Sequence, residues 1–410
     1  MKTTNLDRIA EGETQEISDR GDTKIYLIRI LLVSIAFASS CKEPYVPPKD
    51  LNTTTNYLVV DGILKLGADS TYISLSRTRS YFDSLPSVPE LNAVVILVGQ
   101  FGETIPLYQL GNGLYASANL FMNQNETYTL QISTTDGKQY QSDSIIAQYC
   151  PPIDSVSWKQ DSTSAESKQG VTIYVTTHDP LNNTRFYRWE YAETWQYRSA
   201  YFSNLIYVDN SNSLRLRDSN EMVYDCWKFH PSTELQLASS SKLSSDIIFE
   251  NPLVFIPVGD QRLGVEYSIL VKQYALAEEA YNYWQNLKKN TELTGSIFDP
   301  QPSQGVGNLH CISDPSVPVL GYISASAVQE MRLFISYRAL NDWNYSNLNG
   351  CAPPLSMPAY DPDSLHHYFH EEGYVPTIIF GFPPRVGASY NSCVDCTIQG
   401  GTNMKPLFWP

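Results

Sequence analysis

The chain has 410 residues, of which 42% are hydrophobic, 12% aromatic and only 17% charged, and its formal net charge is −15. Phosphate binding requires clustered cations, so the excess of 43 acidic over 28 basic residues argues against nucleic acid as a partner. The aromatic content excludes a chain that is disordered throughout, because such chains lack the apolar side chains that pack a core. The composition indicates a polar, tyrosine-rich, strand-forming protein of the kind found outside the cytoplasm.

Residues 1–40 are predicted to be an export signal. The only strongly apolar run, 25–38, is interrupted by Arg29 and is too short for the roughly 20 residues of a membrane-spanning helix. Lys24 precedes the run and Ala38-Ser39-Ser40-Cys41 follows it, which is the pattern of a signal peptide and its cleavage site. The residues before Cys41 resemble the bacterial lipobox, which predicts acylation of this thiol. An ordinary signal peptide with an incidental cysteine is the alternative, and the acidic stretch 1–23 leaves the true start of translation open.

Residues 41–55 are predicted to be a lipidated tether. Pro44, Pro47 and Pro48 favour an extended chain that holds the first domain away from the lipid. Lys42-Glu43, directly behind the predicted lipid, resembles the surface-export signal of Bacteroidota lipoproteins. The expected location is therefore the outer membrane, with the protein exposed at the cell surface, and retention on the periplasmic face is the alternative.

Residues 56–149 are predicted to form a β-sandwich. Thr71–Ser76 and Thr127–Ile132 alternate apolar and polar side chains as half-buried strands do, and Ala93–Val98 has the continuous apolar character of a strand buried on both faces. The Gly111-Asn112-Gly113 and Asp136-Gly137 sequences are hairpin signals. Short strands at this spacing, without a helical period, indicate an immunoglobulin-like or prealbumin-like sandwich.

Residues 150–340 are predicted to form a second sandwich, which begins after the strand-breaking Pro151-Pro152. Its strands are expected at positions that include 171–176, 186–191, 194–197, 205–208, 253–257, 266–273, 319–324 and 331–337. One helix is predicted over 277–293, because Ala277, Ala280, Tyr281, Trp284 and Leu287 form a single apolar stripe, interpreted as a packing face. The predicted class is mainly β, with two immunoglobulin-like or fibronectin-like sandwich domains, one inserted helix and a loop-rich, disulfide-linked C-terminal region, 341–410.

Six cysteines remain when Cys41 is set aside, and an even number in an exported chain predicts disulfides. The candidates are Cys150, Cys226, Cys311, Cys351, Cys393 and Cys396, and their pairing stays open. Cys393-Val-Asp-Cys396 has two other interpretations, a redox pair or half of a zinc site. A four-cysteine zinc site would need a second such pair, which the sequence lacks.

A histidine cluster, His366-His367-Tyr368-Phe369-His370, is the candidate metal site. On a helix, His366 and His370 would share one face, as in zincin motifs, although His367 stands where those enzymes carry a general-base glutamate. The alternative is a solvated polar loop or short surface helix. The stretch Asp209–Ser213 is interpreted as a turn, because a calcium loop would need glycine where Leu214 stands.

Several stretches resemble a family of Bacteroidota outer-membrane lipoproteins known as domain of unknown function 4249. They are Cys41-Lys-Glu-Pro-Tyr45, Leu58-Val-Val-Asp-Gly62, Pro151-Pro-Ile-Asp-Ser-Val156, Tyr187-Arg-Trp-Glu-Tyr191, the block 267–299, Gly321-Tyr322, Cys396 with Gly400-Gly401, and Phe408-Trp409. The resemblance implies no enzymatic activity and no catalytic residues. It implies an accessory to TonB-dependent outer-membrane transporters.

The predicted function is that of a lipid-anchored binding or accessory subunit without enzymatic activity and without a cofactor. Its candidate contact residues are Trp195, Tyr197, Tyr201 and Phe202, because aromatic side chains bury a large area at low entropic cost; the alternative places them in a strand core. A surface metal-dependent hydrolase that uses His366 and His370 is the second hypothesis, and a glycan-binding module is the third.

Overall fold

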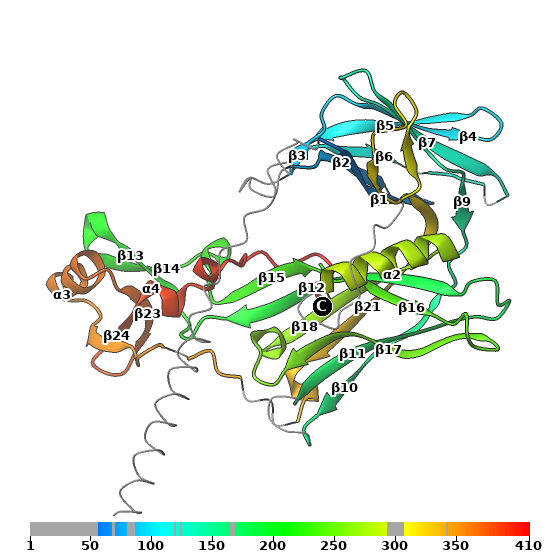
Figure 1. Cartoon of the computed structure of the whole chain (residues 1–410). Coiled ribbons are helices and arrows are strands. Elements are labelled where there is room, and N and C mark those ends of the chain that lie inside the picture. The colour runs from blue at the N-terminus through cyan, green and yellow to red at the C-terminus, as the bar shows by residue number, and fades with distance from the viewer. Residues whose placement is uncertain are drawn as a thin grey trace, which may run out of the picture. The chain divides into compact units, whose positions relative to one another are not determined.

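The computed structural model describes residues 56–67, 70–79, 87–118, 120–123, 125–163, 169–292, 307–341, 343, 345–348 and 350–410 (Figure 1). By its internal contacts the chain divides into two units, and these residues belong to the unit that spans Thr55–Arg79 and Asp83–Pro410. The predicted signal peptide, Cys41 and the tether lie outside the described residues. The mainly β class is confirmed, because strands in several sheets dominate the described chain.

The N-terminal strands follow the alternation of their sequence. In β2 and β7 every second side chain is buried, as expected for strands with one face on a core. Asn112 and Gly113, with φ of 48° and 73°, join β5 to β6 through the left-handed backbone that a tight hairpin requires. These strands are β1 (Leu58–Leu66), β2 (Thr71–Arg77), β3 (Val88–Pro89), β4 (Val94–Gly99), β5 (Thr104–Gly111), β6 (Leu114–Ser117), β7 (Thr127–Ser133), β8 (Gln139–Ser142) and β9 (Ile145–Gln148).

Strands from much later in the chain complete the N-terminal core. β19 (Leu309–Cys311) pairs with β8, and both β20 (Val319–Gly321) and β21 (Ser324–Ser336) run parallel to β1. Gly321 allows this approach, because a Cβ at this position would lie 1.9 Å from the carbonyl oxygen of Val60. The core contains side chains from both parts of the chain, including Leu58, Leu97, Leu130, Leu309 and Ile323. Chain order alone does not predict this pairing.

A second core lies among the strands that follow residue 150. β10 (Ile153–Asp161), β11 (Gly170–Asp179) and β17 (Asp246–Pro257) form one sheet. The other contains β15 (Asp225–Pro231), β12 (Phe186–Arg198), β18 (Glu266–Ala275) and β21, with β16 (Gln236–Ser239) also paired to β12. Tyr187, Trp189 and Tyr267 are fully buried between these strands. Much of the tyrosine content noted in the sequence is therefore core.

The predicted helix is confirmed as α2 (Glu278–Glu292). Ala280 and Trp284 are buried, and Tyr281 and Leu287 pack beside them against side chains of β12 and β16. The apolar stripe is thus a packing face, as the sequence predicted. Among the described residues, no helix combines the length and the apolarity needed to cross a bilayer.

The C-terminal region has a small core of its own. β22 (Leu355–Pro358), β24 (Arg385–Ser389) and β23 (Val375–Phe380) form a three-stranded sheet. The hairpin of β13 (Leu205–Val208) and β14 (Ser213–Leu216) joins it, together with α3 (Pro362–His366) and a π-helical turn, His367–Glu371 (Figure 1). Met357, Leu365, Phe369 and Val386 fill this core. A short helix, α4 (Asn391–Val394), follows. We call these elements the C-terminal subdomain; the sequence predicted the strand at 205–208 and offered a short surface helix at the histidine cluster, but it did not predict the other elements.

Two disulfides stabilise this region, which confirms part of the cysteine prediction. Cys226 of β15 pairs with Cys396, and Cys351 pairs with Cys393. The redox and zinc interpretations of 393–396 are therefore wrong, since each of these two cysteines is bonded to a different partner. The prediction that Cys150 and Cys311 take part in disulfides is also wrong. Both are free, buried thiols that pack as small apolar side chains. Burial raises the pKa of Cys150 to about 12, so its thiol is unreactive.

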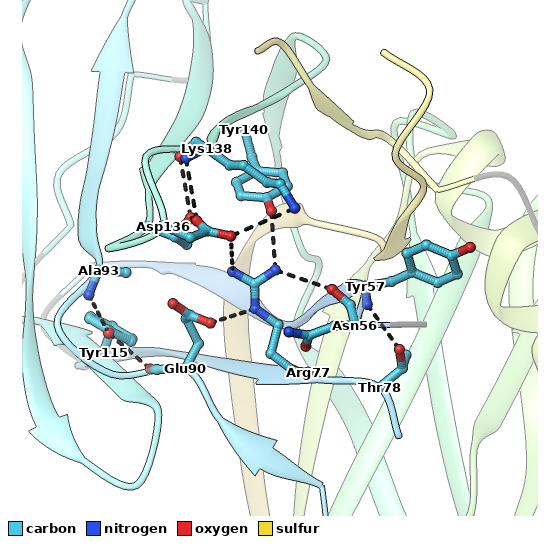
Figure 2. A network of polar contacts seen from close by, with 11 residues as sticks. Asn56, Tyr57, Arg77, Thr78, Glu90, Ala93, Tyr115, Asp136, Lys138 and Tyr140 are labelled. Atoms are coloured by element: carbon cyan, nitrogen blue, oxygen red, sulfur yellow. Dashed lines mark hydrogen bonds and ion pairs between the residues drawn. The ribbon is translucent and has the colours of Figure 1, made fainter. Parts of the chain in front are cut away.

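A buried ionic network connects the strands of the N-terminal core (Figure 2). Arg77 at the end of β2 is 6% exposed and pairs through Nε with Glu90, which is 8% exposed. Its Nη1 donates to the Tyr140 hydroxyl at 3.2 Å, and its Nη2 lies 3.7 Å from Asp136 in the β7–β8 turn. The guanidinium thus links three separate stretches of chain, and its carboxylate partner would be left uncompensated without it.

Candidate metal centre

Asp209, His366 and His370 converge on the surface of the C-terminal subdomain. One ligand atom from each lies within 4.8 Å of the others. The imidazole rings of His366 and His370 stack with their centroids 4.6 Å apart and their planes at 15°. Asp209 Oδ1 lies 2.8 Å from Nδ1 of His370. The two histidines predicted from the sequence do share a face, and the structure adds a carboxylate to them.

The local sequence explains why the histidines face outward. Pro362 occupies the first turn of α3, where its missing N–H costs no hydrogen bond. Leu365 and Phe369, four residues apart, are buried in the core of the subdomain and fix the orientation of this helical segment. His366 and His370 each follow one of these anchors and so lie side by side at the edge of the buried face. The π-helical turn that carries His370 is a feature that occurs often at functional sites.

Asp209 comes from a distant part of the chain. It begins a 3-10 turn, η3 (Asp209–Ser211), between β13 and β14, and Asn212 ends this turn in the left-handed conformation. The interpretation of 209–213 as a turn is therefore confirmed. The hairpin packs on the helical segment through Tyr207 and Phe369, whose ring centroids are 5.7 Å apart. This contact brings the carboxylate to the histidines.

Tyr207 orients the imidazole of His366. The Tyr207 hydroxyl donates its single proton to Asn212 Oδ1 at 2.9 Å. It lies 3.3 Å from Nδ1 of His366 and must therefore accept there, which assigns the proton of the neutral imidazole to Nδ1. Nε2 of His366 then keeps its lone pair. Outer-sphere contacts of this kind fix the tautomer and the ring orientation of metal-ligating histidines.

The three side chains suit a divalent transition metal. Two imidazoles and one carboxylate are donors that zinc, copper, nickel and ferrous iron accept. Bonds of ~2.1 Å in a tetrahedral site separate the ligand atoms by about 3.4 Å. The side chains of His366, His370 and Asp209 are 39%, 51% and 58% exposed, so side-chain rotation can close the remaining distance. An ion here would take the place of the direct contact between Asp209 and His370.

A second carboxylate lies beside the centre. Glu371 Oε1 is 3.9 Å from Nε2 of His366, and its Oε2 lies 2.7 Å from Nδ1 of His367. The hydrogen bond from His367 is the main cause of a lowered pKa at Glu371, which keeps this carboxyl ionised. The site therefore carries negative charge near Nε2 of His366, the imidazole nitrogen that keeps its lone pair.

The aromatic residues predicted as contacts do not form one surface. Tyr197 is fully buried and its hydroxyl donates to the carbonyl oxygen of Cys396 at 2.7 Å, so its assignment as a contact residue is wrong. Trp195 is half-buried against two cores. Tyr201 is half-buried and donates to the Cys351 carbonyl at 3.3 Å, whereas Phe202 is 42% exposed. The strand-core alternative therefore describes Trp195 and Tyr197 of β12, whereas Tyr201 and Phe202 follow the strand and Phe202 is exposed.

The family described as "Domain of unknown function (DUF4249)" matches residues 42–332, well over half of the chain. No curated protein matches. Among solved structures, a Salmonella alpha-2-macroglobulin mutant is 12% identical over 58% of this chain with a TM-score of 0.17, and trypsin-activated alpha-2-macroglobulin from Escherichia coli is 10% identical over 55% with a TM-score of 0.17. This chain spans only 15% of each macroglobulin chain, and so weak a likeness carries no argument. The family match shows that the chain belongs to the DUF4249 family.

Proposed function

We propose that this protein is a binding subunit of the cell envelope that captures a divalent transition-metal ion at Asp209, His366 and His370. The observation that supports this most is the convergence of three metal-ligating atoms within 4.8 Å, drawn from two elements far apart in the chain. The tautomer that Tyr207 imposes on His366 supports it further, because it leaves a nitrogen lone pair for an ion.

The exposure of the ligands favours binding over catalysis. Three protein ligands leave coordination positions open, as catalytic zinc sites do. Hydrolysis also needs a substrate held in a concave, largely dry site, and all three side chains here are more than a third exposed. A surface hydrolase remains the second candidate because of the open positions, and turnover that depends on His370 would favour it.

Loss of one ligand is expected to weaken metal binding strongly. His370→Ala should weaken the affinity for Zn²⁺ about 100-fold or more, because removing even an outer-sphere partner of such a ligand costs 10–100-fold. Tyr207→Phe, which removes only the outer-sphere hydroxyl, should cost about tenfold. Isothermal titration with Zn²⁺ against the mature chain measures both, and the wild-type stoichiometry should be one ion per chain.

A matched control is available elsewhere on the surface. His310 has a similar exposure, 58%, and an acidic partner, Asp143, at 2.9 Å, without being part of the three-ligand group. His310→Ala should bind Zn²⁺ as the wild type does. Equal affinities for His370→Ala and His310→Ala, or a wild type that binds no Zn²⁺, would overturn the metal proposal.

We further propose that the protein acts at the outer membrane, held there by lipid on Cys41, as an accessory of a TonB-dependent transporter. The support for this is the sequence Ala38-Ser-Ser-Cys41 and the resemblance noted above. The native protein should co-purify with such a transporter from outer membranes, and Cys41→Ser should leave the membrane fraction. Recovery without any transporter, in quantity or in trace, would contradict the accessory role.

A further inference from the structure

A polar cavity of about 390 Å³ lies in the second core region, far in sequence from the histidine cluster. Tyr191 and Glu193 of β12, His230 of β15 and Phe255 of β17 contribute to its wall. Glu193 and His230 are direct register partners across β12 and β15. The volume falls in the range of small-molecule sites.

Glu193 presents an available oxygen to this cavity. Glu193 is 3% exposed, and its Oε1 accepts two hydrogen bonds. One comes from the Tyr267 hydroxyl at 2.8 Å and the other from Arg262 Nη1 at 2.9 Å. The other oxygen, Oε2, faces Nδ1 of His230 at 3.5 Å, which is at the outer limit for a hydrogen bond. A buried carboxylate oxygen with so weak a partner can accept a further donor.

The cavity is negatively charged. Arg262 is shared between Glu193 and Asp260, whose Oδ2 lies 2.9 Å from Nη2 and whose Oδ1 lies 3.2 Å from Nε. One guanidinium therefore faces these two carboxylates, and Glu234 adds a third on the cavity wall. Burial and the charges of Glu193 and Glu234 together raise the pKa of Tyr191 to about 12, which is consistent with this excess of negative charge.

Aromatic rings flank the charged groups. Tyr191 is 7% exposed and Phe255 is 44% exposed, and both line the cavity. A cation is attracted electrostatically by the face of an aromatic ring as well as by a carboxylate. An anion is less favoured, because three of the five N–H groups of Arg262 already donate to Glu193 and Asp260, and these two carboxylates compensate its charge.

We propose that this cavity binds a small organic cation, an alkylammonium or arylalkylammonium group that donates to Glu193 Oε2 and Glu234 while its hydrocarbon part packs on Tyr191 and Phe255. The cavity is distinct from the candidate metal centre and does not depend on a bound metal. It would give the protein a site for an organic ligand in addition to the proposed metal ion.

Three probes of similar shape and different charge test this inference. Benzylamine, benzyl alcohol and benzoate are titrated in turn into the mature full chain, with EDTA present so that metal binding plays no part, and binding is followed by calorimetry and by NMR shifts. Benzylamine should bind with saturation and the other two should not. Glu234→Gln should weaken benzylamine about tenfold or more, since hydrogen bonds to charged groups are the stronger kind.

Glu250→Gln is the matched control, because Glu250 lies on β17 and pairs with Lys159 outside the cavity wall. The Glu250→Gln variant should leave benzylamine binding unchanged. Glu193→Gln should abolish binding, and a thermal melt of this variant shows whether the core still folds. If Glu193→Gln unfolds, Glu234→Gln still tests the site. Equal binding of all three probes, preferential binding of benzoate, no binding of benzylamine, or equal effects of Glu234→Gln and Glu250→Gln would overturn the inference.

Discussion

Arg77→Met is expected to destabilise the N-terminal core by about 3–5 kcal/mol, because removing one partner of a buried ion pair leaves the other charge uncompensated. The carboxylate left behind is Glu90, which is 8% exposed. Methionine keeps much of the apolar stem of the arginine side chain. The loss of stability would therefore report on the guanidinium and its contacts to Glu90, Tyr140 and Asp136. Urea unfolding followed by far-UV circular dichroism measures the change in the free energy of unfolding.

An exposed ion pair provides the comparison. Lys159, whose side chain is 58% exposed, pairs with Glu250, and Lys159→Met should cost at most about 1 kcal/mol because solvent screens such pairs. The double variant Arg77→Met with Glu90→Gln should recover part of the loss, since it removes the unpaired charge. A loss for Arg77→Met no larger than that for Lys159→Met would contradict the structural role of the network.

Removal of the Cys226–Cys396 disulfide is expected to cost about 2–5 kcal/mol. The bond closes a loop of 170 residues and ties the C-terminal tail to β15, where Trp227 also pairs with Thr402 through two backbone hydrogen bonds. In the chain-entropy description, a cross-link over a longer loop restricts the unfolded chain more. The double variant Cys226→Ser, Cys396→Ser should therefore show a lower unfolding midpoint in urea than the wild type.

The second disulfide is a matched control of shorter span. Cys351 and Cys393 are separated by only 42 residues, so Cys351→Ser with Cys393→Ser should cost less by roughly 1 kcal/mol. Both double variants replace two sulfurs by two hydroxyls, which makes the comparison one of loop length and local packing. An equal or reversed order of stabilities would show that local packing outweighs loop closure.

Local patterns in the sequence predicted local structure well. The alternation in Thr127–Ile132 and the stripe of Ala280, Tyr281 and Trp284 are short-range signals, because a residue's face in a strand or helix depends only on its spacing from its neighbours. The hairpin signals at Asn112 and Gly137 are equally local, and both glycine-containing turns have the expected positive φ. These features could be read from the chain without knowledge of its partners.

Pairing between distant segments could not be predicted in the same way. No pattern within Leu309–Cys311 indicates that it pairs with β8, since any strand with a suitable face would satisfy the same alternation. The strand at 205–208 was predicted, but its packing into a C-terminal subdomain was missed, because the other strands and helices are short and the core draws Leu205 from a hairpin far upstream. The pairing of the cysteines also depends on this packing.

The charge and composition argue against nucleic acid and indicate a chain rich in strands. The sequence by itself predicted the helix, most individual strands and the shared face of His366 and His370. Only the tertiary structure decided that Asp209 joins His366 and His370, and that Glu193 meets Arg262 and His230. The physical reason is that spacing along the chain sets which side chains share a face, whereas long-range packing sets which faces meet.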